Sequence, residues 1–456
     1  MTSAAPAPEL DAQARRRVLF ATTIGTAVEW YDYFLYAASA GLVFNHLFFS
    51  ELEGGLALIL SYLTVGLSFL FRPFGAFLAG HFGDRYGRRV VLMVTLFGMG
   101  IATTLIGVLP TYEAIGIAAP ILLILLRIIQ GISAGGEWGG AVLLSVEHAP
   151  ANKRGFFGSF PQMGVPAGLL LSSGVMALMS NIAPGDAFLD WGWRVPFLLS
   201  IVLVAVGYLV RMGVEESPVF TEIEERKKTA QAPIGDLLRK STPLVLVAAL
   251  LFAGNNAVGY MTAGGYVQGY ATNPTGPIAL ERSVVLWSVT ASAVAWLVTT
   301  GFAGWISDFW GRRTTYIVGY LLQLVGAVAL FPIINLGGST MLTLGLLLLT
   351  VGLGLTYGQQ SATYAELFPA SMRFSGVSIS YAIGAIFGGA FAPMIAQWLF
   401  ETTGGTAAIS AYLAFMTLVG LGAALALRDR TGIPLGPDHE AEQAISPLRF
   451  HKVEQA

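Results

Sequence analysis

Charge is scarce in this chain of 456 residues: Asp, Glu, Lys and Arg make up 11% of it, against about 25% in ordinary soluble domains. Hydrophobic residues make up 55% before the 55 glycines are counted. So few charges cannot cover the surface of several water-soluble domains, and the formal net charge of −2 offers no basic face to a nucleic acid. We therefore expect lipid to be the main solvent around the folded chain.

Cysteine is absent, which excludes disulfides, thiolate metal ligands and thiol nucleophiles. The 5 histidines form no pair at a metal-ligand spacing, and there is no G-x-x-x-x-G-K-[ST] phosphate loop. We therefore expect no metal, no organic cofactor and no enzymatic activity.

Long apolar runs dominate what is present. A bilayer core about 30 Å thick needs roughly 20 apolar residues per helix, and twelve runs of this kind can be found. They cover approximately 18–48, 56–81, 90–109, 117–147, 155–182, 195–213, 242–270, 283–307, 314–334, 340–364, 375–400 and 405–427. The first run lacks a small-residue cleavage site and contains Glu29 and Asp32, so we expect it to remain as a helix rather than be removed as a signal peptide.

The positive charges predict the orientation. If both termini are cytoplasmic, nearly all Lys and Arg outside the runs fall on the cytoplasmic side, with Arg194 and Arg282 as exceptions. The expected fold class is therefore an all-α integral membrane protein with twelve transmembrane helices and cytoplasmic ends.

Two signatures repeat along the chain. Residues 80–89 read GHFGDRYGRR and residues 304–313 read GWISDFWGRR, so both follow G-x-x-x-D-x-x-G-R-R. Glu147, Pro150 and Arg154 likewise recur as Glu366, Pro369 and Arg373. Such repeats predict two six-helix bundles of parallel topology, an architecture typical of transporters. The expected divisions are an N-terminus (1–17), a first bundle (18–213), a charged linker (214–241), a second bundle (242–427) and a tail (428–456).

At these motifs the chain resembles the major facilitator superfamily. More narrowly, EWYDY at 29–33, RPFGA at 72–76, RIIQGISAGGE at 127–137 and WGWRVPF at 191–197 are similar to the metabolite:H⁺ symporter family, over about residues 15–430. The resemblance implies proton-coupled transport of dicarboxylates, tricarboxylates, aromatic or alicyclic acids, or zwitterionic osmolytes. The tail contains Pro434, Pro437 and Pro447 and no heptad run, unlike the coiled-coil tail of the osmosensing members.

A few ionisable residues lie well inside the predicted spans, all in the first half: Glu29, Asp32, Arg72, Arg127 and Glu137. A charge at the bilayer centre costs about 2.5–3.5 kcal/mol on insertion scales, so each is a functional candidate. A proton carrier must be a group that can be neutralised, which makes Asp32 the first candidate, Glu29 the second and Glu137 the third. Arg72 and Arg127 suit counter-ions or bidentate clamps for a substrate carboxylate. The alternative is a permanent ion pair that joins helices.

Helical spacing groups some of these residues. Residues 127, 130, 134 and 138 would place Arg127, Gln130 and Trp138 on one face of the fourth span. On the first span, Glu29, Asp32, Tyr33 and Tyr36 form one stripe, which we expect to face a cavity.

The second half has neutral polar groups in its spans instead. Asn255, Asn256 and Tyr260 lie in the seventh span, and Tyr357 and Gln360 in the tenth, where they could orient a polar ligand. Gly254, Gly259, Gly264 and Gly265 would allow the seventh helix to bend. The alternative for each polar group is an interhelical hydrogen bond.

The two G-x-x-x-D-x-x-G-R-R loops are expected at the cytoplasmic surface, away from substrate. Their aspartates could accept hydrogen bonds from a neighbouring helix N-terminus and pair with the motif arginines, which would make a gating latch. The residues of this predicted latch are Gly80, Asp84, Arg85, Arg88, Asp308, Arg312, Glu147 and Glu366. The alternative is a loop that serves only to set the orientation.

Together these observations predict a proton-coupled symporter that imports a small organic acid or zwitterionic metabolite by alternating access. The expected partners are that small molecule, which we expect to bear a carboxylate, protons as the coupling ion, and the lipid of a bacterial cytoplasmic membrane. We expect the monomer to be the functional unit and no nucleic acid to bind. A proton-independent facilitator or a proton-coupled exporter of the same fold remains the alternative.

Overall fold

The computed structural model describes residues 12–86, 88–136, 138–147, 149–212 and 233–449. This part of the chain is helical throughout, apart from turns and one isolated β-bridge between Leu427 and Leu448.

The first half forms one group of helices. Its long members are α1 (Ala12–Ser39), α3 (Gly54–Tyr86), α4 (Arg88–Val108), α6 (Ala118–Ser133), α7 (Trp138–Glu147), α8 (Arg154–Ile182) and α9 (Arg194–Met212). Short helices connect them: η1 (Ala40–Phe44), α2 (Asn45–Leu47), α5 (Tyr112–Ile115), η2 (Ala134–Gly136), η3 (Ala151–Lys153) and η4 (Phe188–Gly192).

The second half forms the other group. It consists of α11 (Pro233–Ala263), α12 (Tyr266–Thr272), α13 (Arg282–Trp310), α14 (Arg312–Ile334), α15 (Gly338–Tyr357), α16 (Gln360–Leu367), η6 (Ala370–Met372), α17 (Arg373–Ala385), η7 (Ile386–Ala390), α18 (Ala392–Thr403) and α19 (Ala407–Ala426). After α19 the tail folds into η8 (Pro437–His439) and α20 (Glu440–Gln443).

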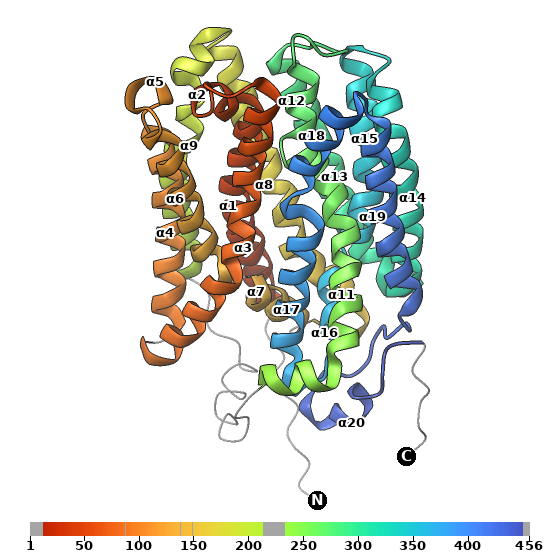
Figure 1. The fold of residues 1–456 in the computed structure, drawn as a ribbon. Helices are drawn as coiled ribbons and strands as arrows, with labels where there is room; N and C mark the ends of the chain where they lie inside the picture. The colour runs from red at the N-terminus through yellow and green to blue at the C-terminus, as the bar shows by residue number, and fades with distance from the viewer. Residues whose placement is uncertain (1–11, 87, 137, 148, 213–232, 450–456) are drawn as a thin grey trace, which may run out of the picture.

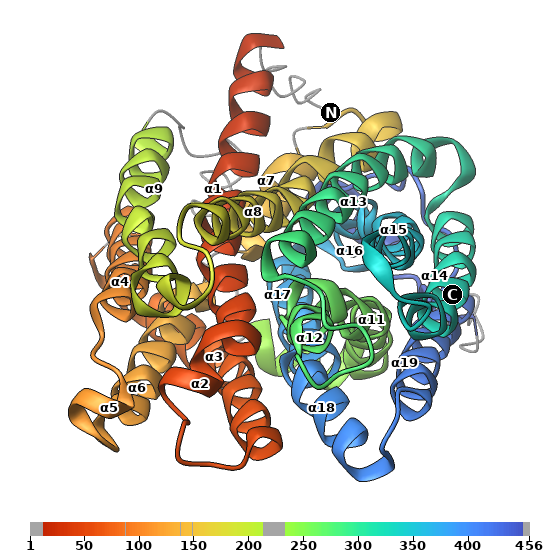
Figure 2. The same ribbon diagram turned by 90° about the horizontal axis from the view of Figure 1, so that it is seen from above.

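The two groups lie side by side, and their helices run along one common axis (Figures 1 and 2). Helix α8 of the first half packs along α13 of the second, and α3 packs against α18. We call the end of the bundle where α20 lies the tail-side end, and the opposite end, with α2 and α12, the far end (Figure 1).

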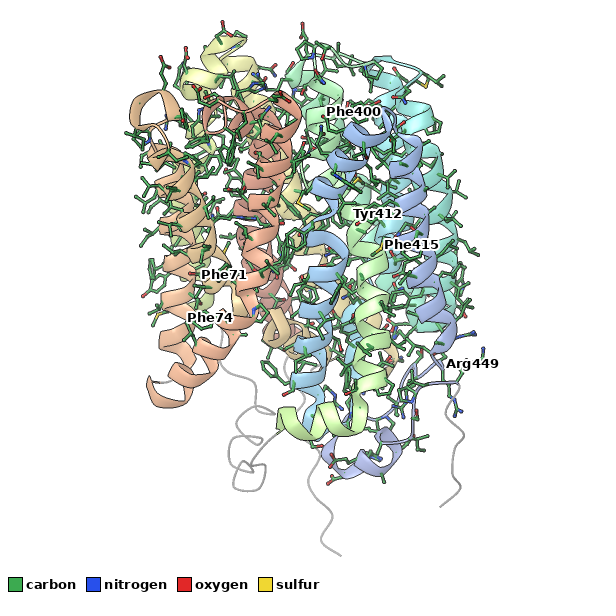
Figure 3. The ribbon with its side chains drawn as sticks, viewed as in Figure 1. Phe71, Phe74, Phe400, Tyr412, Phe415 and Arg449 are labelled. Carbon is green, nitrogen blue, oxygen red and sulfur yellow. The ribbon has the colours of Figure 1, made fainter. Side chains whose placement is uncertain are left out.

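The outer surface is apolar along the length of the bundle. Phe74 on α3 is 52% exposed and Phe415 on α19 is 62% exposed (Figure 3). Nine helices of the described chain are long and apolar enough to cross a bilayer, and α1, α4 and α6 correspond to the remaining predicted spans. An apolar exterior of this extent requires lipid as its solvent.

Several predicted spans are interrupted at glycines, among them 117–147 and 242–270. The run 117–147 is not one helix: α6 ends at Ser133 and η2 follows, because Gly135 packs directly on the α3 backbone at Arg72 and Ala76. The prediction that Arg127 and Trp138 share one continuous helical face was therefore wrong. Of the four glycines expected to let the seventh span bend, Gly254 and Gly259 lie inside the unbroken helix α11, whereas α11 ends before Gly264 and Gly265 adopts φ 86°.

Candidate transport site

A small cavity lies between the two halves near the middle of the bundle. Its lining residues are Trp30, Phe34 and Val165 of the first half and Phe252, Asn255, Asn256, Gly259, Tyr260, Trp296 and Tyr357 of the second. Its volume of about 10 Å³ is about the least that holds one water molecule. The structure thus brings together Asn255, Asn256, Tyr260 and Tyr357 as predicted, whereas Gln360 is buried in α16 and does not line this cavity.

Two indole groups of the cavity wall have no internal partner. Among the described residues, neither Trp30 Nε1 nor Trp296 Nε1 has a hydrogen-bond acceptor, although both atoms are buried. An indole N–H is only a donor, and a buried donor without an acceptor costs about 1–3 kcal/mol. Each half thus contributes to the cavity wall one tryptophan whose indole N–H lacks an acceptor among the described residues.

The neighbouring asparagines differ in how firmly they are held. Asn255 donates to the Leu353 carbonyl at 3.1 Å and to the Thr356 hydroxyl, which in turn donates to Gln323 Oε1. Asn256 makes one longer hydrogen bond, 3.4 Å, to the Ala385 carbonyl. Asn255 thus joins helices, the alternative considered from the sequence, while Asn256 is the less constrained of the two.

Asp32 lies on the other side of α1, inside the first half. Its side chain is buried, and its two oxygens accept hydrogen bonds from Ser200 Oγ on α9 at 2.6 Å and from Thr103 Oγ1 on α4 at 2.9 Å. No cation of the described residues forms an ion pair with it. A carboxyl in such a place is held by neutral donors alone.

A chain of hydrogen bonds links Asp32 to Arg127. Gln130 Nε2 donates to Thr103 Oγ1 at 2.7 Å, and Gln130 Oε1 accepts from Arg127 Nη1 at 2.9 Å. The predicted proton site and the predicted clamp are therefore connected through two neutral side chains rather than by direct contact.

Arg127 is buried against aromatic rings. Its guanidinium carbon lies 4.1 Å from the ring centre of Tyr36 and 4.6 Å from that of Tyr33, and its other N–H groups donate to the carbonyls of Thr64 and Val65 at 3.3 Å. Cation–π contacts and carbonyls replace a carboxylate partner, which the described residues do not supply within ion-pair distance.

Arg72 and Glu29 form the ion pair that the sequence left open as an alternative, at 3.9 Å. The Arg72 guanidinium also lies over the rings of Phe69 and Trp30, 4.5 and 5.4 Å from their centres. Because Trp30 lines the cavity, this pair stands directly behind the cavity wall.

The predicted stripe on α1 does not face the cavity. Glu29, Asp32, Tyr33 and Tyr36 are all buried, but the cavity-lining residues of α1 are Trp30 and Phe34, whose rings contact that of Tyr33. The stripe is thus buried away from lipid but does not line this cavity: Asp32 is held by helices of its own half, while the Tyr33 ring lies 5.7 Å from that of Tyr260 in the second half. Glu137 lies outside the described residues, as does the side chain of Trp138.

The second latch motif takes the geometry that its sequence predicts. Asp308 accepts hydrogen bonds from the backbone N–H groups of Gly155 and Phe156, at 2.8 and 2.9 Å, at the start of α8 in the other half. Asp308 also pairs with Arg312 at 2.8 Å. For the first motif, Asp84, Arg85 and Arg88 lie at the junction of α3 and α4, and their side chains and that of Gly80 fall outside the described set.

Acidic residues of both halves complete the latch. Glu366 pairs with Arg312 at 3.0 Å within the second half and with Arg154 of the first half at 3.8 Å. Glu147 pairs across the halves with Arg373 at 3.3 Å. Because Arg154 and Arg373 are themselves the repeated motif residues, the second signature forms two exchanged pairs between the halves.

The tail covers this latch. Thr431 Oγ1 accepts from the Arg312 backbone N–H at 3.0 Å, Asp429 accepts from that of Arg313 at 3.1 Å, and the Ile433 carbonyl accepts from Arg154. The carbonyl of Leu435 accepts from Arg373 at 3.1 Å. The tail thus contacts arginines of both halves.

The far end has no ion pair between the described residues of the two halves, but the Arg282 guanidinium at the start of α13 lies 4.3 Å from the ring centre of Phe188 in the first half. Tyr62 donates to the Gly265 carbonyl at 3.1 Å, and the backbones of Gly41 and Gly265 approach so closely that a Cβ on either would overlap the other segment. With the latch formed at the tail-side end, both ends of the cavity are shut.

Sequence reasoning missed Thr103, Ser200, Trp30 and Trp296. Thr103 and Ser200 are small residues that a membrane helix tolerates for packing alone, so no pattern marks them as partners of Asp32. The two Trp resemble interfacial or packing residues until the structure places them at one cavity.

A fold of two helical halves around a central cavity, with buried ionisable groups and an end closed by ion pairs between the halves, is typical of a secondary transporter. Family models agree: "Sugar (and other) transporter" matches residues 18–243, and "Major Facilitator Superfamily" matches residues 266–453. The chain belongs to the major facilitator superfamily.

The chain is also similar over most of its length to individual metabolite transporters. The chain is 40% identical to the inner membrane metabolite transport protein YhjE of Escherichia coli K12, over 90% of this chain and 93% of that protein. It is 38% identical to the shikimate transporter (91% and 94%) and 31% identical to the proline/betaine transporter (92% and 85%) of the same strain.

Among solved structures, the proton:xylose symporter XylE superposes with a TM-score of 0.72 at 17% identity, over 95% of this chain and 99% of that one, which supports the fold. The chain is therefore a multi-pass membrane transporter of metabolites and not an enzyme, as its sequence predicted.

Proposed function

We propose that this transporter is a proton-coupled symporter that imports a small, carboxylate-bearing metabolite across the bacterial cytoplasmic membrane. The observation that carries the proposal is Asp32, a buried carboxyl held by the hydroxyls of Thr103 and Ser200 with no ion-pair partner among the described residues. A proton carrier has to exist in both charge states, and an acid locked against an arginine would be fixed in one.

The alternatives for Asp32 are less suited. Glu29 is paired with Arg72 at 3.9 Å, so its negative charge is already compensated. We therefore assign proton loading to Asp32 first, and a tuning role to the Glu29–Arg72 pair behind the cavity wall.

The chemistry of the cavity supports an oxygen-bearing substrate. The indole N–H groups of Trp30 and Trp296 need acceptors, and carboxylate or hydroxyl oxygens supply them. Aromatic rings of Phe34, Phe252 and Tyr357 provide apolar walls for a compact carbon body. Relatives named for shikimate and for proline and betaine handle small molecules that bear a carboxylate, which fits the same walls and donors.

The closed ends support alternating access. A cavity of about 10 Å³ is too small for a metabolite, so the contacts between the two halves must open at one end of the bundle to admit substrate. The hydrogen bonds and ion pairs of the latch would hold the tail-side end shut while the far end, closed by Tyr62, glycine contacts and the Arg282–Phe188 contact, opens.

The test is uptake into liposomes that contain the purified protein. Small acids and zwitterions, including shikimate and betaine as probes, are first screened for thermal stabilisation, and the stabilising compounds are then tested with and without an imposed pH gradient. We expect accumulation above the outside concentration only with acid outside. Equal uptake without the gradient would indicate a facilitator, and accumulation only with the opposite gradient would indicate an exporter.

A further inference from the structure

The hydroxyl of Thr103 stands between three groups. It lies 2.9 Å from Asp32 Oδ2, 2.9 Å from the Met99 carbonyl oxygen and 2.7 Å from Gln130 Nε2. A hydroxyl has one hydrogen and two acceptor lone pairs, so it cannot donate to both oxygens at once.

The direction of one of these hydrogen bonds is fixed by Arg127. A guanidinium only donates, so the oxygen of Gln130 must accept from Arg127 and its nitrogen must face Thr103 as a donor. The Thr103 oxygen therefore always accepts a hydrogen bond from Gln130, and its single hydrogen can donate either to Asp32 or to the Met99 carbonyl.

The two choices match the two charge states of Asp32. When the carboxyl is ionised, Thr103 donates to it. When the carboxyl is protonated, its O–H donates to the second lone pair of Thr103, whose own hydrogen turns to the Met99 carbonyl. Every donor and acceptor is satisfied in both states, and no heavy atom has to move.

We propose that Thr103 is a positioning residue for coupling: its hydroxyl reverses direction so that Asp32 can gain and lose a proton in a dry site. The proposal rests on the proposed symport and deepens it. It does not require substrate to touch Thr103, and it explains why a neutral side chain lies between the acid and Arg127.

The charged groups that act on Asp32 are few. Glu29 comes from the same helix and Arg127 from α6, while Arg72 of α3 is engaged with Glu29. Tyr31 is the adjacent titratable residue, and its hydroxyl donates to the Pro196 carbonyl on α9 at 2.8 Å. None of these groups is altered by replacing Thr103.

The neighbouring Thr104 offers a matched control. It lies on the same helix and donates only to the carbonyl of Gly100, four residues earlier, at 2.8 Å. A threonine that merely bonds its own helix would behave like Thr104.

The experiment measures the pH dependence of gradient-driven uptake in liposomes for Thr103→Val, Thr103→Ser and Thr104→Val. Thr103→Val removes a donor from the carboxylate, which favours the protonated form, so the pH of half-maximal uptake should rise by about one unit, since about 1.4 kcal/mol corresponds to one unit. Proton release then becomes harder and the accumulation ratio should fall. Thr103→Ser should restore the wild-type profile, and Thr104→Val should leave it unchanged.

An unshifted profile in Thr103→Val, or a serine variant that fails to restore it, would overturn the inference. If the valine variant does not fold, Thr103→Ala and Ser200→Ala each remove one donor from Asp32 and must shift the profile in the same direction. Failure of the symport proposal can be distinguished from failure of this inference, because uptake by the wild-type protein would then be independent of the pH gradient.

Discussion

The two halves use charge in opposite ways. In the first half, Asp32, Arg72 and Arg127 are buried deep in the bundle, and their partners are mostly hydroxyls, carbonyls and aromatic rings. In the second half, the spans carry neutral groups such as Asn255 and Gln323, and the ion pairs lie at the tail-side end, where Asp308, Arg312, Glu366 and Arg373 pair with one another and with the first half.

The difference separates a half that can change its charge from a half that holds its position. A carboxyl with neutral partners can be neutralised at modest cost, whereas a paired acid such as Glu366 loses attraction when it is protonated. We infer that proton exchange belongs to the first half and gating to the seam between the halves.

Asp32→Asn should produce the largest effect. The amide keeps the size of the side chain but cannot carry a proton, so gradient-driven accumulation should fall to the equilibrium level, while exchange of labelled for unlabelled substrate is retained. The measurement is paired uptake and counterflow in the same liposomes. Asp190→Asn, an exposed acid in η4, is the control, and normal accumulation in Asp32→Asn would refute the assignment of proton loading to the first half.

Arg127→Lys should rank second. A lysine keeps the positive charge but cannot donate at once to Gln130, Thr64 and Val65, so the link to Asp32 is lost. We expect about a tenfold or greater rise in KM, because an unmade buried hydrogen bond costs about 1–3 kcal/mol and 1.4 kcal/mol is a factor of ten. A wild-type KM in Arg127→Lys would show that the positive charge at position 127 suffices for transport and that the hydrogen bonds of the guanidinium are not required.

Glu366→Gln tests the other half of the comparison. It weakens the contacts to Arg312 and Arg154, so the tail-side end should open more often. The chain has no cysteine, which makes Ser361→Cys, a buried position on α16, a clean reporter. We expect labelling of this cysteine by a thiol reagent to accelerate about fivefold. Glu281→Gln, at the start of α13 in the far end, should leave the rate unchanged.

The paired variants Asn255→Ala and Asn256→Ala should have smaller and different effects. Asn255 joins α11 to α15 through two hydrogen bonds, so its loss should lower the melting temperature, at a cost of about 1–2 kcal/mol. Asn256 has one long hydrogen bond and faces the same cavity, so its loss should weaken substrate binding with little change in melting. The reverse pattern would contradict the division between structural and ligand-facing amides.

The sequence predicted those features of the fold that produce a long or repeated pattern of residues. Apolar runs predicted the helices, and the spacing in residues 304–313 predicted that Asp308 would meet a helix N-terminus and pair with Arg312. Asn255, Asn256, Tyr260 and Tyr357, which the sequence offered as groups that could orient a ligand, line one cavity, and their role in binding stays a prediction.

It was less informative where a contact depends on how helices rotate. Helical spacing cannot say which face of α1 turns to the second half, so the stripe with Asp32 was assigned to the cavity that Trp30 and Phe34 line. Thr103 and Ser200 come from helices distant in sequence, and their meeting at Asp32 is set by packing alone.

Removal of residues 429–456 should have the smallest effect on transport, and it tests how much the tail contributes to closing the tail-side end between the two halves. The tail bonds the backbone of Arg312 and Arg313 and the side chains of Arg154 and Arg373, but it leaves the ion pairs of Glu366 and Glu147 in place. Labelling of Ser361→Cys should therefore rise less than in Glu366→Gln, about twofold. If truncation opens the seam more than Glu366→Gln does, the tail rather than the repeated ion pairs is the principal lock of the tail-side end.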